Sequence, residues 1–251
     1  MCRRHRETLS PGDPGRRLPP WRGFTYGEFV ILAEDVLLLL TDDASGKTVV
    51  DKTHLDLALA GGVLLDLATL GRVDVTGPGE QVKAGRLVVR DVAPTDDDVL
   101  DEALRRVGVL GPMKPYRVLP KLARGLREDL LGRMVGRGIL RAQEGRILGI
   151  FPSHTWPALD SSHEREVRAG LHDVLVVGRA PAPREAALIS LLQAIGQVPK
   201  VLPGAGVPAR ELRRRARDVA QGRFVDEAVR RAVEEISAAT MTAITAATTS
   251  A

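Results

Sequence analysis

Two arginines near the middle of the chain have the spacing expected of a phosphate-binding pair. Arg124 and Arg127 lie three residues apart in the segment KLARGLR, which begins at Lys121. If this segment is helical, the two side chains share one face of the helix. Guanidinium groups make planar, bidentate contacts to phosphate, so two of them on one face would hold a phosphate group. The alternative is an ordinary solvated face, because paired arginines are common on exposed helices.

An apolar stretch follows this segment. Ile147, Leu148, Ile150 and Phe151 come soon after a Glu-Gly pair at 144–145, which predicts the turn of a β-hairpin. An exposed apolar tip near a basic face suits shallow insertion into a membrane, or self-association. The alternative is that alternate residues of the hairpin pack inward.

Motifs of catalysis and metal binding are missing from the sequence. It contains no GxSxG, HExxH or GxxxxGK[ST], and the serines before His163 have no identifiable partner acid. The acidic run at 96–98 coincides with a predicted helix start, where acids are favoured. Cys2 is the only cysteine, and the five histidines show no tight ligand spacing. We therefore expect no enzyme activity, no metal site and no cofactor.

The charge composition says little about partners. The chain has 36 basic and 32 acidic residues and a net charge of +4; six of the basic residues are lysines, which leaves 30 arginines. Codon usage in a GC-rich genome explains that bias. Nucleic-acid binding through the arginines at 213–215 and 230–231 is a weaker hypothesis, because acids such as Glu211 and Asp218 interleave with them. We expect no nucleic-acid partner.

Helical patterns dominate residues 25–237. Apolar residues almost all round the segment 53–70 predict a central helix, and its Gly61-Gly62 pair indicates close helix packing. The fold class is therefore mainly α: one compact multi-helix domain with small β-hairpins. The Arg/Pro-rich residues 1–24 are predicted to be a disordered tail, and the Ala/Thr-rich residues 238–251 a low-complexity tail that frays. Further helices are expected at 26–41, 95–107, 120–137, 161–177, 183–195, 209–221 and 224–236.

Several segments occur in the order found in the Golgi phosphoprotein 3 family, which this chain resembles. They are LAEDVLLLL at 32–40, the turn at 43–46, GVLLDLATLGRV at 62–73, APTD at 93–96, LDEAL at 100–104, RGLREDL at 124–130, VGRGIL at 135–140 and the hairpin up to Pro157. The resemblance covers about residues 30–235 and implies helices around a central helical bundle, with a protruding hairpin. The Arg-rich composition favours a bacterial member, in which Golgi sorting could not be the role.

The resemblance also implies a ligand. Eukaryotic members bind phosphatidylinositol 4-phosphate on Golgi membranes and help to retain glycosyltransferases through their cytoplasmic tails. The family's headgroup pocket uses two basic residues three apart on a helix, which match Arg124 and Arg127. The hairpin matches the family's oligomerisation and membrane-contact element, and this assigns that role to the four apolar residues between 147 and 151.

The rest of the family pocket is not matched. The family uses a Trp and an Arg near the second helix, and those positions are Asp51 and Ala60 here. A lost Arg contact to phosphate costs about 1.5–3 kcal/mol, and Asp51 would repel an anion if it faced the pocket. Lys52 and Arg72 are the candidates to compensate.

These features support one functional hypothesis and one rival. The hypothesis is a peripheral membrane adaptor that binds phosphatidylinositol 4-phosphate or another anionic phospholipid, forms a homo-oligomer and has unknown protein clients. The rival is a soluble protein-interaction scaffold of the same fold that has lost lipid binding. No stretch approaches the roughly 20 apolar residues that a membrane-spanning helix needs. We therefore expect a cytoplasmic protein that associates peripherally with membranes.

Overall fold

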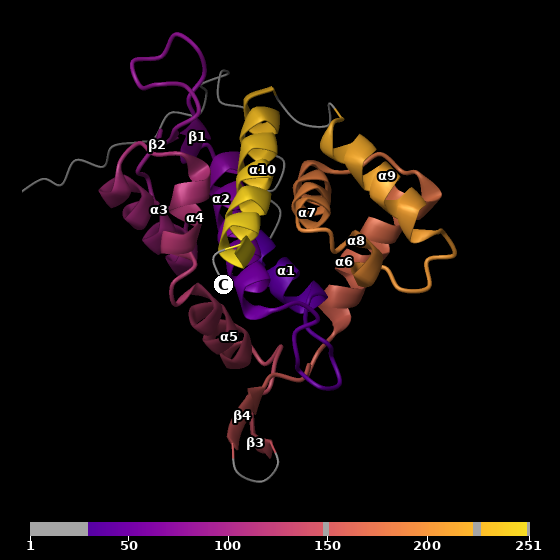
Figure 1. The fold of residues 1–251 in the computed structure, drawn as a ribbon. Helices are drawn as coiled ribbons and strands as arrows, with labels where there is room; N and C mark the ends of the chain where they lie inside the picture. Colours follow the sequence, from indigo (N-terminus) through magenta and orange to yellow (C-terminus); the bar gives the residue numbers. More distant parts are fainter. Residues whose placement is uncertain (1–29, 148–150, 223–226, 250–251) are drawn as a thin grey trace, which may run out of the picture. The chain divides into compact units, whose positions relative to one another are not determined.

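The apolar helix α2 (Lys52–Thr69) lies at the centre of the fold (Figure 1). The structure is a computed structural model, and it describes residues 30–147, 151–222 and 227–249. Asp51 caps α2 by accepting a hydrogen bond from the His54 amide at 3.0 Å. Helices α1 (Leu32–Leu39) and α10 (Glu227–Thr249) pack directly against α2, whose apolar side chains are buried all round. The central helix predicted from the sequence is confirmed.

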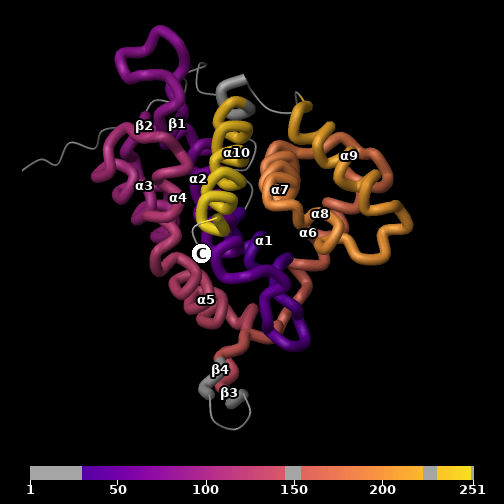
Figure 2. The backbone as a smooth tube through the Cα atoms, viewed as in Figure 1, coloured from indigo at the N-terminus to yellow at the C-terminus, as the bar shows by residue number. Residues whose placement is uncertain are grey.

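Two groups of helices lie on either side of α2 and α10 (Figure 2). The first comprises α3 (Asp98–Leu110), α4 (Pro115–Leu122) and α5 (Leu126–Gly136). The second comprises α6 (Ser162–His172), the π-helical turn η1 (Asp173–Val177), α7 (Pro183–Ala194), α8 (Val198–Val201) and α9 (Ala209–Ala220). The last helix, α10, contacts α2, α4 and α7, so it joins the two groups. The mainly α, multi-helix fold class is thus confirmed.

The glycine pair in α2 permits the close approach of two helices. A Cβ atom on Gly61 would lie 2.8 Å from Thr240 Oγ1 on α10, and one on Gly62 would lie 2.9 Å from the Ala33 backbone nitrogen on α1. Both distances are shorter than a normal contact with a carbon atom. The backbone of α1 cannot rotate away as a side chain can, so Gly62 is the more restrictive position.

Replacing Gly62 with alanine should therefore destabilise the protein. Overpacking of a close-packed core costs about 1–3 kcal/mol, which outweighs the gain of about 1 kcal/mol from the better helix propensity of alanine. The measurement is the urea unfolding midpoint. Gly132→Ala is the matched control, because Gly132 is an exposed residue of α5 with no atom within 4 Å of its added Cβ among the residues that the structure describes. A Gly62→Ala protein as stable as Gly132→Ala would contradict the packing argument.

Two short antiparallel strand pairs complete the fold. Strand β1 (Val73–Val75) pairs with β2 (Leu87–Val89), and β3 (Gln143–Ile147) pairs with β4 (Phe151–Thr155). In Figure 1 the β3–β4 hairpin extends away from the helices beyond the end of α5. The predicted turn at 144–145 is wrong: both residues lie within β3, opposite His154 and Ser153. The connection falls at 148–150, outside the described residues.

The helix predicted at 120–137 is two helices. Helix α4 ends at Leu122 and α5 begins at Leu126, with Gly125 between them at φ 78°. This left-handed conformation is one that glycine adopts without the cost that a Cβ atom imposes. Pro120, inside α4, also lacks the N–H that a continuous helix would use. Arg124 therefore lies in the turn between the helices and Arg127 in the first turn of α5, so they do not share the face of one helix.

The C-terminal residues do not fray. Helix α10 continues to Thr249, and Thr240, Ala243 and Ile244 are buried with exposed fractions of 0%, 5% and 4%. Together with Ile236 they recur with helical spacing, which the Ala/Thr-rich composition obscures. The small side chain of Thr240 allows α10 to approach α2 closely at Gly61. The predicted tail at 238–251 is thus helical through Thr249, and it contributes to the core as far as Ile244.

The compact unit of the structure begins at Ile31 and runs to Ala251. The predicted tail at 1–24 lies outside the described residues. Across the described ranges, no helix combines the length and the apolar character that crossing a membrane requires.

Candidate anion-binding site

An open cavity lies where the first turn of α2, the α4–α5 turn and the last turns of α10 meet. Its volume is about 630 Å³. Its lining combines apolar and charged side chains. The lining residues are Lys52, Thr53, Asp56, Leu57, Pro120, Ala123, Arg124, Gly125, Glu128, Ala243 and Ala247. Residues from distant parts of the chain are thus brought together at one place.

Two cations of the lining have no acidic partner among the described residues. Lys52, on the first turn of α2, and Arg124, in the α4–α5 turn, are both exposed, and neither forms an ion pair with any residue that the structure describes. The charge of Lys52 acts on nearby Asp56, but a ligand would not have to break an ion pair with any described residue to reach either cation. The backbone of Arg124 is held by α3, because the Arg124 carbonyl accepts a hydrogen bond from Arg106 Nη1 at 3.0 Å.

The N-terminus of α5 opens beside the same cavity. Its N-cap is Gly125, which has no side chain, so the N-cap residue cannot cap the first amides of the helix. The Leu126 amide donates to the Ala123 carbonyl at 3.4 Å. The helix dipole and the remaining amides of the first turn attract anions at a helix N-terminus. This backbone feature adds to the charges of Lys52 and Arg124.

Arg127, unlike these two cations, is held in ion pairs. Its Nε lies 3.5 Å from Asp56 Oδ1 and its Nη2 lies 3.1 Å from Glu128 Oε1. Its side chain is 19% exposed and does not line the cavity. Burial raises the pKa of Asp56, while the nearby charges of Arg127 and Lys52 oppose this shift. Three cations against two acids leave this corner with a net charge of about +1 when both acids are ionised.

Comparison with known proteins places the chain in a family. The family model described as Golgi phosphoprotein 3 (GPP34) matches residues 32–236, which is most of the chain. The chain is a member of the Golgi phosphoprotein 3 family. It is also 27% identical over 162 residues to vacuolar protein sorting-associated protein 74 of Eremothecium gossypii. That alignment covers 58% of this chain and 49% of the relative, so the chain matches about half the length of this curated relative.

The two arginines that the resemblance matched to a basic pair differ in their surroundings. Arg124 faces the cavity and Arg127 is held by acids. Of the two candidates for compensation, Lys52 lines the cavity. Arg72 does not, because it follows the other end of α2, an 18-residue helix that is about 27 Å long. It pairs instead with Asp91 and donates to the Pro94 carbonyl at 3.1 Å.

The two positions that depart from the family pocket lie outside the cavity lining. Asp51 is the N-cap of α2, and its carboxylate contacts both the amide and the ring of His54. Ala60 is fully buried in the core. The acids that do line the cavity are Asp56 and Glu128. Sequence reasoning missed Asp56 as a site residue, although it stands four residues after Lys52 and so on the same face of α2.

The hairpin residues are only partly described. Ile147 ends β3 and Phe151 begins β4, where their backbones pair. Leu148 and Ile150 lie outside the described residues. The membrane or oligomer contact assigned to these four residues stays a prediction.

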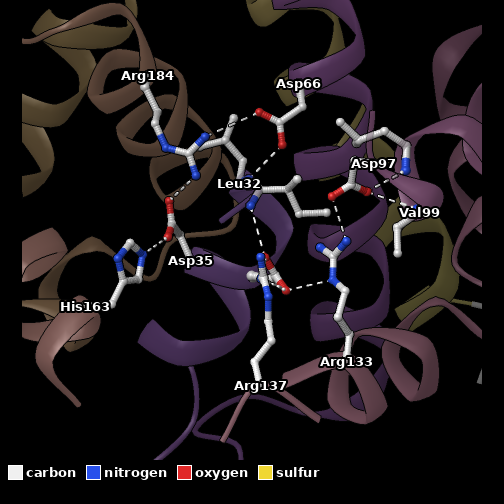
Figure 3. Close-up of polar contacts among 12 residues, drawn as sticks. Leu32, Asp35, Asp66, Asp97, Val99, Arg133, Arg137, His163 and Arg184 are labelled. Carbon is white, nitrogen blue, oxygen red and sulfur yellow. Dashed lines mark hydrogen bonds and ion pairs between the residues drawn. The ribbon is translucent and has the colours of Figure 1, made fainter. Parts of the chain in front are cut away.

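A buried polar network holds α5 in place (Figure 3). The fully buried Glu34 of α1 accepts from Arg133 Nε at 2.9 Å and from Arg137 Nη1 at 3.1 Å. Arg133 also reaches Asp97, the N-cap of α3, at 2.6 Å through Nη1. These contacts fix α5, and with it the helix N-terminus at the cavity, against α1 and α3. The sequence signal is the Glu-Asp pair that interrupts the apolar residues of α1.

The network continues toward α6 and α7. Asp35, 2% exposed, lies 2.7 Å from His163 Nε2 and accepts from Arg184 Nη2 at 2.7 Å. The hydrogen bond with Asp35 raises the pKa of His163. Burial raises the pKa of Asp66 to about 7, and this carboxyl accepts from the Leu32 amide at 2.7 Å. His163 therefore has an acidic partner, Asp35, that its sequence neighbours do not reveal.

Proposed function

We propose that the cavity binds the phosphorylated headgroup of an anionic phospholipid and that the protein is a peripheral membrane adaptor rather than an enzyme. The observation that carries this proposal is the convergence of two cations, Lys52 and Arg124, with the N-terminus of α5 around one open cavity. Neither cation is paired with an acid in the part of the chain that the structure describes. Phosphatidylinositol 4-phosphate is the first ligand to test, because the family is known for binding it.

A single site of this kind attaches a protein to a membrane only weakly. Stable attachment needs a second signal, and two linked weak contacts can raise the overall affinity by about 10²–10⁴. The β3–β4 hairpin is the proposed second contact, either with the membrane interface or with a second copy of the chain. The proposed location is the cytoplasmic face of a membrane.

One observation favours the rival function. Asp56 and Glu128 lie in the cavity lining and hold Arg127. A carboxylate in the place of a phosphate oxygen is what a site that has lost lipid binding would show. The rival is a protein-interaction scaffold of the same fold.

Vesicle co-sedimentation separates the two functions. Vesicles of neutral phosphatidylcholine, of phosphatidylcholine with phosphatidylserine, and of phosphatidylcholine with phosphatidylinositol 4-phosphate are compared, using the wild type and Lys52→Ala/Arg124→Ala. Selective pelleting with phosphatidylinositol 4-phosphate is expected. The double variant should lose more than about a hundredfold in affinity, because it removes two charged contacts of about 1.5–3 kcal/mol each.

Lys121→Ala is the matched control for this experiment. Lys121 is an exposed residue of the last turn of α4 and does not line the cavity. Its removal should leave pelleting unchanged. Equal pelleting on every anionic vesicle would reduce the interaction to surface electrostatics. No pelleting with any vesicle would favour the scaffold.

A further inference from the structure

Asp56 is in a position that an anion-binding cavity does not explain. Its carboxylate lines the cavity, yet its Oδ1 atom is buried and accepts no hydrogen bond from the described residues. The cation that it faces, Arg127 Nε, is 3.5 Å away, which is an ion pair without a hydrogen bond. A buried carboxylate oxygen without a hydrogen bond carries a desolvation cost. The pairing of Asp56 with Arg127 is therefore incomplete.

The charged surroundings of Asp56 come from two helices and the turn between α4 and α5. The last turns of α10, which close the other side, contribute only Ala243 and Ala247 to the lining, and α4 contributes Pro120. None of these three side chains carries a charge. The charged groups that act on Asp56 are Arg127, Lys52 and Glu128, and Arg124 lines the same cavity.

We propose that Asp56 is an internal competitor of the bound anion. It holds Arg127 when no anion is bound; when a tetrahedral oxyanion enters the cavity, Arg127 turns to the anion and Asp56 takes up a proton from solvent. The site would thereby couple phosphate binding to proton uptake. This inference rests on the proposed function only for the source of the phosphate. Binding of a free phosphate ester would be coupled to proton uptake by Asp56 in the same way.

The direction of the effect follows from charge. An anion placed beside Asp56 disfavours its ionised form and removes its partner Arg127, so the pKa of Asp56 is higher in the complex than in the free protein. Burial already raises that pKa in the free protein, with Arg127 and Lys52 opposing the shift. A group that binds its proton more tightly in the complex makes the affinity for the anion rise as the pH falls through this range.

The first test uses sulfate, a tetrahedral dianion that does not itself titrate between mild acid and neutrality. Its dissociation constant is measured by NMR titration of the backbone amides around Arg124. The wild type should bind sulfate about tenfold more tightly near pH 5 than near pH 7.5, within the limit of about tenfold per pH unit that one proton allows. An affinity that does not change with pH would overturn the proposal.

The second test removes the titrating group. Asp56→Asn should bind sulfate near pH 7.5 about tenfold more tightly than the wild type, since a contact to a charged group contributes about 1.5–3 kcal/mol. Its affinity should also lose most of its pH dependence. Asp129→Asn is the matched control, because it also removes one negative charge near Arg127, from the first turn of α5, at a residue outside this cavity. Asp129→Asn should keep the pH dependence of the wild type. If protonation of histidines elsewhere caused that dependence, the wild type, Asp56→Asn and Asp129→Asn would all show it equally.

Vesicles then separate the sources of the phosphate. With phosphatidylinositol 4-phosphate vesicles near pH 7.5, Asp56→Asn should pellet at a lower lipid concentration than the wild type. A linkage seen with sulfate but no pelleting of either protein would keep the proton-coupled site and refute the lipid function. The competitor would be refuted, and the lipid function kept, by a different pair of results. In that case the wild type pellets, Asp56→Asn pellets no better, and sulfate binding does not depend on pH. Failure of both proteins to bind either probe would overturn both.

Discussion

Arg133→Ala should destabilise the fold by about 3 kcal/mol, the lower end of the cost of breaking a buried ion pair from one side. Arg133 joins the fully buried Glu34 at 2.9 Å to Asp97 at 2.6 Å. Without it, Asp97 loses this ion pair. Glu34 keeps Arg137, which holds the expected cost at the lower end of the range. The measurement is chemical unfolding followed by circular dichroism.

Arg105→Ala is the matched control for this prediction. Arg105 also bridges to a carboxylate, Glu102, at 2.7 Å, but on an exposed face of α3. Exposed pairs contribute about 0–1 kcal/mol. Equal losses in the two variants would mean that burial adds nothing to the network. Arg133→Ala should also weaken sulfate binding, because Arg133 fixes the helix whose N-terminus borders the cavity.

The central helix could be predicted from the sequence because the residues that determine it lie within one segment. Helix α2 is apolar on nearly every side, so it could only be a buried helix. Its glycine pair predicts that neighbouring helices occupy the space of the missing Cβ atoms. Thr240 and Ala33 do so, at 2.8 and 2.9 Å from where those Cβ atoms would lie. Burial and close packing leave a pattern within a single segment, which one sequence shows.

The site was harder to predict from the sequence because its contacts join segments that are far apart in the chain. The spacing of Leu122, Leu126 and Leu130 continues through the α4–α5 turn as in one helix, although the backbone turns at Gly125. The partner of Arg127 is Asp56, from a different part of the chain. Residue types and spacing could therefore select the arginines, but they could not show which of them has an acid beside it.

The same distinction separates Lys52 from Arg72. Both are cations at an end of α2, and the sequence offers no reason to prefer one. Only the packing of α10 and the α4–α5 turn around the first turn of α2 makes Lys52 part of a cavity. Arg72 instead contacts the loop after β2, through Asp91 and Pro94.

Ending the chain after Ser237 should destabilise the fold more than any single substitution in its core. The deleted half of α10 contains the buried Thr240, Ala243 and Ile244, and Thr240 packs against Gly61 of the central helix. Loss of Ile244 side-chain burial alone costs about 2–5 kcal/mol, and domains of this kind are stable by only about 5–15 kcal/mol. The truncated protein should therefore lose its cooperative unfolding transition.

Point variants keep this prediction testable if the truncated chain cannot be purified. Ile244→Ala should lower the free energy of unfolding by about 2–5 kcal/mol, whereas Thr245→Ala, at the neighbouring exposed position, should change it by less than about 0.5 kcal/mol. Ala243 and Ala247 also line the cavity, so any folded truncated protein should bind sulfate more weakly. A truncated chain with wild-type stability and sulfate affinity would show that the second half of α10 contributes neither to the core nor to the site.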